Sequence, residues 1–344
     1  MVVAVDKELY IITHQKPPEE EKNMTHTTSK VKIILAYRFG FVITFAVIMA
    51  ALIFSCPVSA KTPKQKTFKS PDEAVKAMVS AIKANDAREM TVIFGPDSKT
   101  LVFSGDEVAD KTGRDNFIRA YEEKNRLETV NSNKAILYVG NDDWPMPIPV
   151  VKKGNSWRFD TKAGKEEILQ RRIGKNELNV IQVCKTYVDA QLEYAPRDYD
   201  GDGLFEYAQK LLSAPGKKDG LYWETKEGEE KSPLGTFIAG AAKEGYFPKD
   251  GKSKPTPFHG YYYKILKEQG EDAPGGAYSY VANGKMIGGF ALVAYPAQYG
   301  NSGVMTFIVN KDGIVYQKDL GRNTSKNVQA MKAFNPDKTW KRAE

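Results

Sequence analysis

The chain has 344 residues, which is long enough for two domains with hydrophobic cores of their own. A hydrophobic content of 41% and an aromatic content of 11% exclude an intrinsically disordered protein. The formal net charge is +7, but positive and negative residues are interspersed and no basic run alternates with aromatic residues, which excludes nucleic acid as the natural partner.

The N-terminal 60 residues are expected to form an export signal and not part of the fold. Three basic residues fall within 30–38, an apolar run follows over 39–54, and a small-residue cleavage pattern ends at Ala60. The apolar run is shorter than the roughly 20 residues that a spanning helix needs. We therefore expect cleavage after Ala60 and a periplasmic or secreted protein, with an uncleaved N-terminal membrane anchor as the alternative. Met1 and Met24 both stay open as the start of translation.

Residues 67–165 are predicted to form an α+β domain. Ser70, followed by Pro71 and Glu73, is typical of a helix start, with the serine as N-cap and the glutamate as part of a capping box. Three helices and then three strands are predicted, over 70–84, 90–94, 117–121, 135–140, 147–153 and 157–160. The first two helices and the hairpin at 152–160 resemble those of small periplasmic NTF2-like proteins, which are α+β cones.

The NTF2-like resemblance implies a pocket inside this first domain. Asp142, Asp143, Trp144 and the proline-rich stretch 145–149 are the candidates for its mouth. The alternative, which we favour because aromatic residues mostly serve burial, is that Trp144 and Trp157 are core residues and the prolines stiffen an edge strand. The two adjacent aspartates would point to opposite sides of a strand, so they do not form an acid/base pair.

Residues 166–340 are predicted to form a second α+β domain, in which a long helix packs on an antiparallel sheet. Apolar residues recur at helical spacing over 168–192, with an interruption at Gly174. Cys184 lies on this apolar stripe and is interpreted as a buried small hydrophobe, because a catalytic thiol would need a base beside it. The predicted strands cover 261–265, 287–296, 304–309 and 314–316.

An acidic loop at 198–206 follows the long helix and predicts a calcium site. EF-hand loops carry oxygen ligands at positions 1, 3, 5, 7 and 12 and glycine at position 6. Gly203 fits position 6, whereas Gln209 stands at position 12 in place of the bidentate glutamate. The predicted ligands are the carboxylates of Asp198, Asp200, Asp202 and Glu206 and the carbonyl of Leu204.

Hard oxygen ligands without histidine or cysteine favour Ca²⁺ over transition metals. The alternative for this loop is an Asx-turn that caps a further helix, which we expect from Glu206 to Leu212.

Conventional catalysis has little support in the sequence. His259 is the only histidine after residue 60, and no G-x-S-x-G, P-loop, H-E-x-x-H or dinucleotide-binding pattern is present. A lone histidine beside Gly260, at the start of a tyrosine-rich strand, is more often structural than catalytic. The loop at 300–303 is interpreted as a simple connection.

Two further resemblances concern larger parts of the chain. The long helix and the strands after it resemble the globular sheet of pilins and pseudopilins, although a pilin fuses its apolar helix directly to that sheet and this chain does not. Over most of its length the chain resembles an exported bacterial family, domain of unknown function 2950 (DUF2950), which implies no established activity. The motifs that carry this resemblance lie at 142–145, 157–160, 171–177, 200–203, 259–262 and 315–321.

The expected function is that of an exported, non-catalytic binding or structural module of the cell envelope, stabilised by Ca²⁺ at the acidic loop. One alternative is an accessory subunit of a pilus-like or secretion assembly. The other is an envelope hydrolase that uses His259 or carboxylates. The expected partner is an envelope protein or a glycan, with membrane contact only through an uncleaved signal segment.

Overall fold

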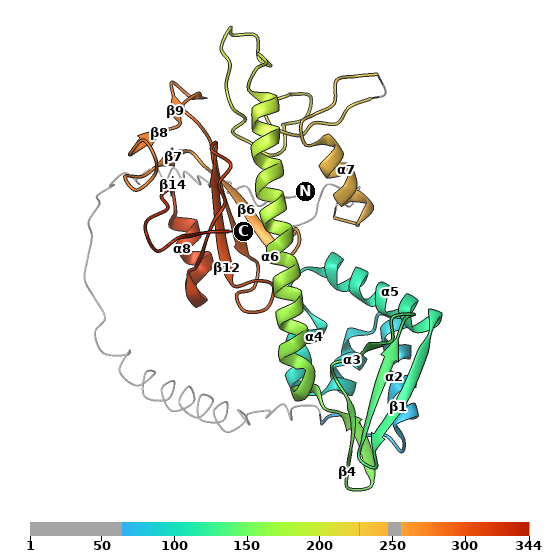
Figure 1. Cartoon of the computed structure of the whole chain (residues 1–344). Helices are drawn as coiled ribbons and strands as arrows, with labels where there is room; N and C mark the ends of the chain where they lie inside the picture. Colours follow the sequence, from blue (N-terminus) through green and yellow to red (C-terminus); the bar gives the residue numbers. More distant parts are fainter. Residues whose placement is uncertain (1–63, 227, 247–255, 344) are drawn as a thin grey trace, which may run out of the picture. The chain divides into compact units, whose positions relative to one another are not determined.

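The computed structural model describes residues 64–226, 228–246 and 256–343, which belong to one compact unit of the chain. It confirms the predicted α+β class: helices and antiparallel sheets are both present (Figure 1). The predicted signal at 1–60 lies outside the described residues. Within the described part, no helix is both long and apolar enough to cross a bilayer.

The N-terminal helices follow the predicted order. They are α2 (Pro71–Lys83), α3 (Ala87–Phe94), α4 (Lys99–Val102) and α5 (Glu107–Glu123), with the 3-10 turn η1 (Pro96–Ser98) before α4. Ser70 caps α2 as predicted, because its Oγ accepts a hydrogen bond of 3.1 Å from the Glu73 N–H. Gly95 ends α3 with a φ of +90°, a conformation that favours glycine.

A five-stranded antiparallel sheet completes this part of the fold. Its strands are β1 (Asn125–Asn131), β2 (Lys134–Val139), β3 (Trp144–Pro145), β4 (Val150–Lys153) and β5 (Ser156–Phe159). The order is β1-β2-β4-β5, with β3 paired to β2. Strand β1 was not predicted, since its residues are largely exposed and polar and show no apolar alternation.

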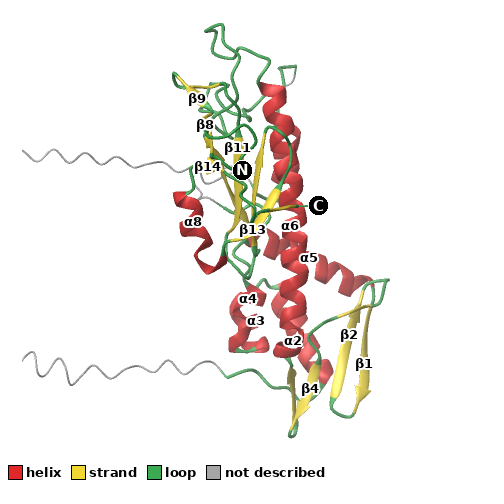
Figure 2. Ribbon diagram, turned by 60° about the vertical axis from the view of Figure 1, so that its left-hand side comes forward, coloured by secondary structure: helices red, strands yellow, loops and turns green. Residues whose placement is uncertain are grey.

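Helix α6 (Thr161–Tyr194) joins the two parts of the described chain (Figure 2). Its 34 residues make it about 51 Å long at 1.5 Å per residue. Asp160 caps its start, and the helix runs through Gly174 without the predicted interruption. Cys184 is fully buried, as predicted, and burial raises the pKa of its thiol to about 12.

The second sheet is an antiparallel meander in the order β15-β13-β12-β11-β6. Its strands are β6 (Tyr261–Leu266), β11 (Ala291–Pro296), β12 (Met305–Asn310), β13 (Tyr316–Asp319) and β15 (Lys341–Arg342). Helix α6 contacts β11 and β12, and α8 (Thr324–Ala330) contacts β11 from the other face (Figure 2). The predicted packing of a long helix on an antiparallel sheet is therefore confirmed.

Short elements fill the connections of this second part. They are α7 (Gly235–Lys243), η2 (Gly321–Asn323), β7 (Glu268–Gln269), β8 (Tyr278–Ser279), β9 (Val281–Ala282), β10 (Lys285–Met286) and β14 (Ala333–Phe334). The described residues carry two separate hydrophobic cores, one drawn from 68–159 and the other from 180–334. The exact domain boundary near residue 165 stays a prediction.

The helix predicted from Glu206 to Leu212 is wrong, because this segment is irregular. Its backbone groups find partners elsewhere in the fold: the Tyr207 N–H donates to the Met286 carbonyl at 2.8 Å, and the Ala208 N–H donates to Gln191 Oε1 at 2.9 Å. Ala208 and Leu211 are buried against the second core. Tertiary hydrogen bonds and burial thus replace the helical bonds that local spacing predicted.

Candidate functional site

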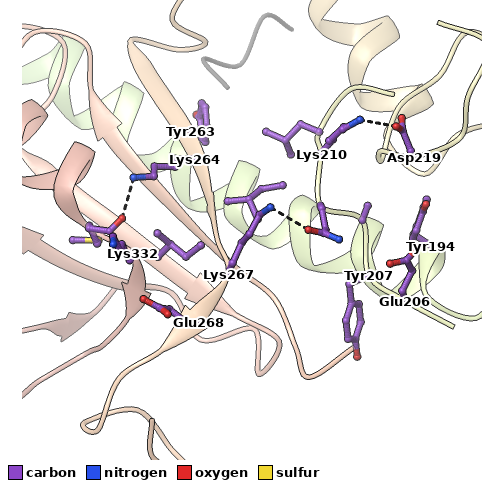
Figure 3. A pocket seen from close by; sticks show the side chains of 16 residues that line it. Tyr194, Glu206, Tyr207, Lys210, Asp219, Tyr263, Lys264, Lys267, Glu268 and Lys332 are labelled. Carbon is purple, nitrogen blue, oxygen red and sulfur yellow. Dashed lines mark hydrogen bonds and ion pairs between the residues drawn. The ribbon is translucent and has the colours of Figure 1, made fainter. Parts of the chain in front are cut away.

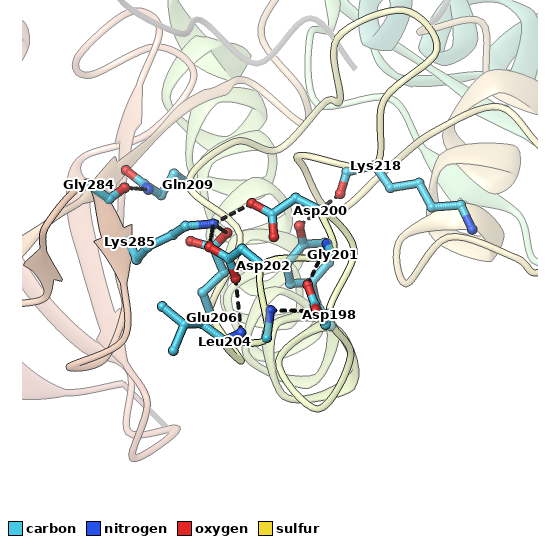
Figure 4. A network of polar contacts seen from close by, with 12 residues as sticks. Asp198, Asp200, Gly201, Asp202, Leu204, Glu206, Gln209, Lys218, Gly284 and Lys285 are labelled. Carbon is cyan, nitrogen blue, oxygen red and sulfur yellow. Dashed lines mark hydrogen bonds and ion pairs between the residues drawn. The ribbon is translucent and has the colours of Figure 1, made fainter.

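The acidic loop folds through its own hydrogen bonds. The carboxylate of Asp198 accepts from the N–H groups of Gly201 at 2.7 Å and Gly203 at 2.8 Å, while Asp202 accepts from the Leu204 N–H at 2.9 Å (Figure 4). Gly201 and Gly203 both have positive φ. These bonds are those of the Asx-turn interpretation, and they lower the pKa of Asp198, chiefly through the Gly203 N–H.

A lysine from a distant hairpin lies among the remaining carboxylates. Lys285 on β10 places its ammonium against Asp200, at 2.7 Å from Asp202 and at 3.1 Å from Glu206 (Figure 4). These hydrogen bonds, led by the one to Asp200, raise the pKa of Lys285 far above its ordinary value, and the bond to Lys285 lowers the pKa of Asp202. Three of the five predicted calcium ligands therefore contact the ammonium group of Lys285.

The donor set of the loop still has the chemistry that Ca²⁺ prefers. Asp198, Asp200 and Asp202 each offer a carboxylate oxygen, and these oxygens lie within 4.8 Å of one another. Gln209 does not take part, because its amide donates to the Gly284 carbonyl at 2.6 Å. The Lys285 ammonium neutralises the same carboxylates, so a metal ion would compete with it.

A groove of about 710 Å³ runs along β6 and the irregular segment after the acidic loop (Figure 3). Three of the four lysines that line it are engaged in contacts within the fold. Lys210 pairs with Asp219 at 2.6 Å, and Lys267 donates to Gln209 at 3.0 Å (Figure 3). Lys264 donates to three carbonyls at the end of α8. The groove thus offers a ligand few unsatisfied charges.

A larger cavity, of about 990 Å³, lies between the N-terminal helices and α6. Its lining combines apolar side chains with charged ones, of which more are positive than negative. The apolar lining residues include Met90, Phe94, Leu101, Phe117, Ile148 and Ile168. The charged residues that line the cavity are Arg114, Arg171, Arg172, Lys175, Asp110 and Glu244. Concave sites of this size with an apolar lining and a few polar groups are typical of small-molecule sites.

Arg172 ties α6 to both parts of the fold at the side of this cavity. Its guanidinium donates to the carbonyls of Thr100 at 2.6 Å and Leu101 at 2.8 Å, and to Asn301 Oδ1 at 2.7 Å. Asn301 in turn donates to the Phe103 carbonyl at 3.0 Å. Burial lowers the pKa of Arg172, and the negative charge of Asp110 partly opposes this effect. The loop at 300–303, which the sequence suggests is a simple connection, is therefore central to this network.

A buried aspartate organises the turn that carries His259. The carboxylate of Asp106 is fully buried and accepts from the Tyr246 hydroxyl at 2.8 Å, the Gly260 N–H at 2.9 Å and the Ala109 N–H at 3.0 Å. His259 and Gly260 have φ values of +50° and +76° and form the two-residue turn of a tight hairpin. Burial raises the pKa of Asp106 despite these bonds.

His259 itself lies in the wall of the cavity. Its ring packs 4.1 Å from the Phe258 ring and 5.7 Å from the Tyr246 ring, measured between centroids. Burial lowers its pKa, and Lys175 lowers it further while Glu244 raises it, so the neutral form dominates near pH 7. In the described part of the chain, no serine hydroxyl or cysteine thiol is hydrogen-bonded to this ring. The position satisfies one requirement of the hydrolase alternative, access to a cavity, without supplying a nucleophile.

Trp144 is not a core residue, contrary to the interpretation favoured from the sequence. Its side chain is 37% exposed, lines the cavity, and lies 5.5 Å from the Arg171 guanidinium. The reason is that β3 is only two residues long and follows a turn in which Asp143 adopts a φ of +48° and pairs with Lys124 at 2.9 Å. Of the candidates for a pocket mouth, Trp144 lines the cavity as an exposed residue, whereas Met146 and Ile148 line it as buried ones.

Motifs far apart in the sequence converge around this cavity. The motif at 171–177 contributes Arg172 and Lys175 to the lining of the cavity, and the motif at 259–262 contributes His259. A family model described as "Protein of unknown function (DUF2950)" matches residues 65–343. No curated protein and no solved structure matches the chain.

Proposed function

Since the chain belongs to the DUF2950 family, whose description names no activity, we propose its function from the geometry of the large cavity. The proposal is an exported, non-catalytic binding module of the cell envelope that holds a small ligand between α5 and α6. The cavity of about 990 Å³, lined by apolar and charged side chains, is the observation that carries it. Export rests on the sequence pattern of residues 1–60 alone.

The polar network around the cavity supports a preformed site. Asp106, Arg172 and Asn301 hold the surrounding segments through side-chain bonds to backbone groups. Because these three side chains are engaged in structure, they set the shape of the cavity and leave binding to other side chains. A site that is already ordered loses less conformational entropy when a ligand enters.

A glycine on α5 allows the cavity to be narrowed without disturbing the core. Gly113 lines the cavity, lies inside a helix, and has nothing within 4 Å of the position that a Cβ would occupy. Gly113→Trp therefore adds a large side chain to the cavity wall. Gly240→Trp is the matched control, because Gly240 lies in α7, also faces open space and does not line the cavity.

The test uses two fluorescent probes with the same ring system, uncharged N-phenyl-1-naphthylamine and anionic 1-anilinonaphthalene-8-sulfonate. We expect native protein to bind at least one of them, Gly240→Trp to bind it equally, and Gly113→Trp to bind it at least about tenfold more weakly. Near-UV circular dichroism checks that both variants are folded. Equal binding by the two variants would refute a ligand site in this cavity.

Calcium stabilisation of the acidic loop is a second proposal. Its support is the approach of three carboxylates within 4.8 Å and the hard oxygen chemistry of the loop. The Lys285 ammonium competes for the same groups, so we expect Lys285→Met to bind Ca²⁺ more tightly than the native protein. Melting temperatures are compared in EDTA and in millimolar CaCl₂. If calcium leaves both proteins unchanged, the loop is an Asx-turn closed by lysine.

The accessory-subunit alternative draws its support from the packing of α6 on the second sheet. The hydrolase alternative draws its support from the position of His259 at the cavity wall. A His259→Ala variant that retains probe binding would agree with a binding module. A hydrolytic activity that disappears in that variant would favour the hydrolase.

A further inference from the structure

The lining of the large cavity combines apolar and cationic side chains, which restricts its ligand. Phe117 on α5 and Ile168 on α6 are apolar lining residues that also pack, partly buried, against the first hydrophobic core. Arg171, Arg172 and Lys175 follow Ile168 within the next two turns of α6 and line the same cavity. A ligand that fills the cavity therefore contacts both apolar groups and cations.

Cationic side chains outnumber carboxylates in the lining of this cavity. Four cationic side chains line the cavity, Arg114, Arg171, Arg172 and Lys175, against two acidic ones, Asp110 and Glu244. The carboxylate of Asp110 already accepts from the Ser104 N–H at 2.9 Å. Of these four cations, Arg171 forms an ion pair, with Glu167 at 2.5 Å.

Two of the cations are partly buried. The hydrogen bonds of Arg172 go to neutral oxygen atoms, and burial lowers its pKa while the nearby Asp110 carboxylate raises it. Arg114 makes a hydrogen bond of 3.2 Å to the Val102 carbonyl, and its Nε is buried without an acceptor among the described residues. An anion in the cavity would improve the electrostatic environment of both guanidinium groups.

Lys175 and Arg171 are the exposed cations of this lining, and Arg171 would share its charge between such an anion and Glu167. Both are exposed residues on α6 that also line the cavity, and Lys175 is close enough to His259 to lower its pKa. The Arg171 guanidinium lies over the Trp144 ring, so it stands at the rim beside an aromatic surface. Charge-assisted hydrogen bonds from these two side chains are the strongest polar contacts that the cavity can offer a ligand.

We propose that the cavity binds an amphipathic anion, with its carboxylate, phosphate or sulfonate at Lys175 and Arg171 and its apolar part against Phe117 and Ile168. This inference rests on the proposed binding function and adds the charge and shape of the ligand. The shared chemistry of the ligand is one anionic group joined to one apolar chain or ring. An uncharged apolar molecule lacks the anionic group, and an inorganic anion lacks the apolar part.

The test compares the two naphthylamine probes, which differ in the sulfonate. We expect the anionic probe to bind about tenfold more tightly than the uncharged one, the gain of a charge-assisted contact. The double variant Arg171→Glu/Lys175→Glu should remove this preference. Lys185→Glu, an exposed substitution elsewhere on α6, should keep it.

Competition by single-chain amphiphiles then identifies the headgroup. Displacement by dodecanoate alone assigns a carboxylate, and displacement by dodecyl phosphate alone assigns a phosphate. Equal displacement by dodecyltrimethylammonium overturns the inference. If both probes bind equally well and Gly113→Trp weakens both, the anion preference is wrong while the binding function stands. If Gly113→Trp affects neither probe, the binding function fails as well.

Discussion

Asp106 offers the sharpest test of how the cavity is held in shape. Asp106→Ala removes the N-cap of α5, which contributes about 1 kcal/mol in typical helices. It also leaves the Gly260 N–H and the Tyr246 hydroxyl without their acceptor in a buried site, at about 1–3 kcal/mol for an unsatisfied donor. Part of this loss is offset, because burial raises the pKa of Asp106 and so opposes its charged form.

We therefore expect Asp106→Ala to lower the free energy of unfolding by about 2–4 kcal/mol. Urea denaturation followed by circular dichroism measures this difference. Asp115→Ala is the matched control on the same helix, since Asp115 is exposed and pairs with Lys111, and it should cost less than about 0.5 kcal/mol. A loss for Asp106→Ala no larger than that of the control would refute the role assigned to this carboxylate.

Four further predictions concern titration, charge neutralisation and thiol reactivity. Lys175→Gln should raise the pKa of His259, measured by NMR, because Lys175 now lowers it; an unchanged pKa would place the lysine away from the ring. Since burial depresses the folded-state pKa of His259 below its unfolded value near 6.5, stability should be full above about pH 6.5 and fall on acidification towards the folded pKa, an effect absent in His259→Phe. Lys285→Met should lower the melting temperature more at pH 7 than at a pH well below 3.8, where the Asp202 carboxylate, whose pKa the lysine lowers, becomes protonated; equal losses would contradict charge neutralisation by the lysine. Cys184 should resist thiol reagents in the folded protein, because burial raises its pKa to about 12, and rapid labelling without denaturant would argue against that burial.

Local signals predicted the elements that depend on local interactions. The structure confirms three such predictions: the capping serine at position 70, the helical spacing along α6 and the alternation in β6. In each case the residues that produce the structure are close together in the sequence. The segment 206–212 has helical spacing as well, but its N–H groups bond to Gln191 and Met286 instead. Partners that distant in sequence leave no local pattern.

Most of the candidate site could not be predicted from the sequence for the same reason. Arg172, His259 and Asn301 come together only when α6, a hairpin turn and a loop meet, and each looks ordinary in isolation. The acidic loop was conspicuous because its aspartates are close in sequence. Its counter-ion, Lys285, lies about eighty residues away and carries no motif. Clustered charge was therefore visible, while the cation that neutralises it was not.

A crystal structure of the protein with dodecanoate would show whether the large cavity binds an amphipathic anion. We expect the carboxylate within hydrogen-bond distance of Lys175 or Arg171 and the alkyl chain against Phe117 and Ile168. Dodecanoate seated instead in the groove along β6, or an empty cavity at saturating dodecanoate, would contradict this expectation.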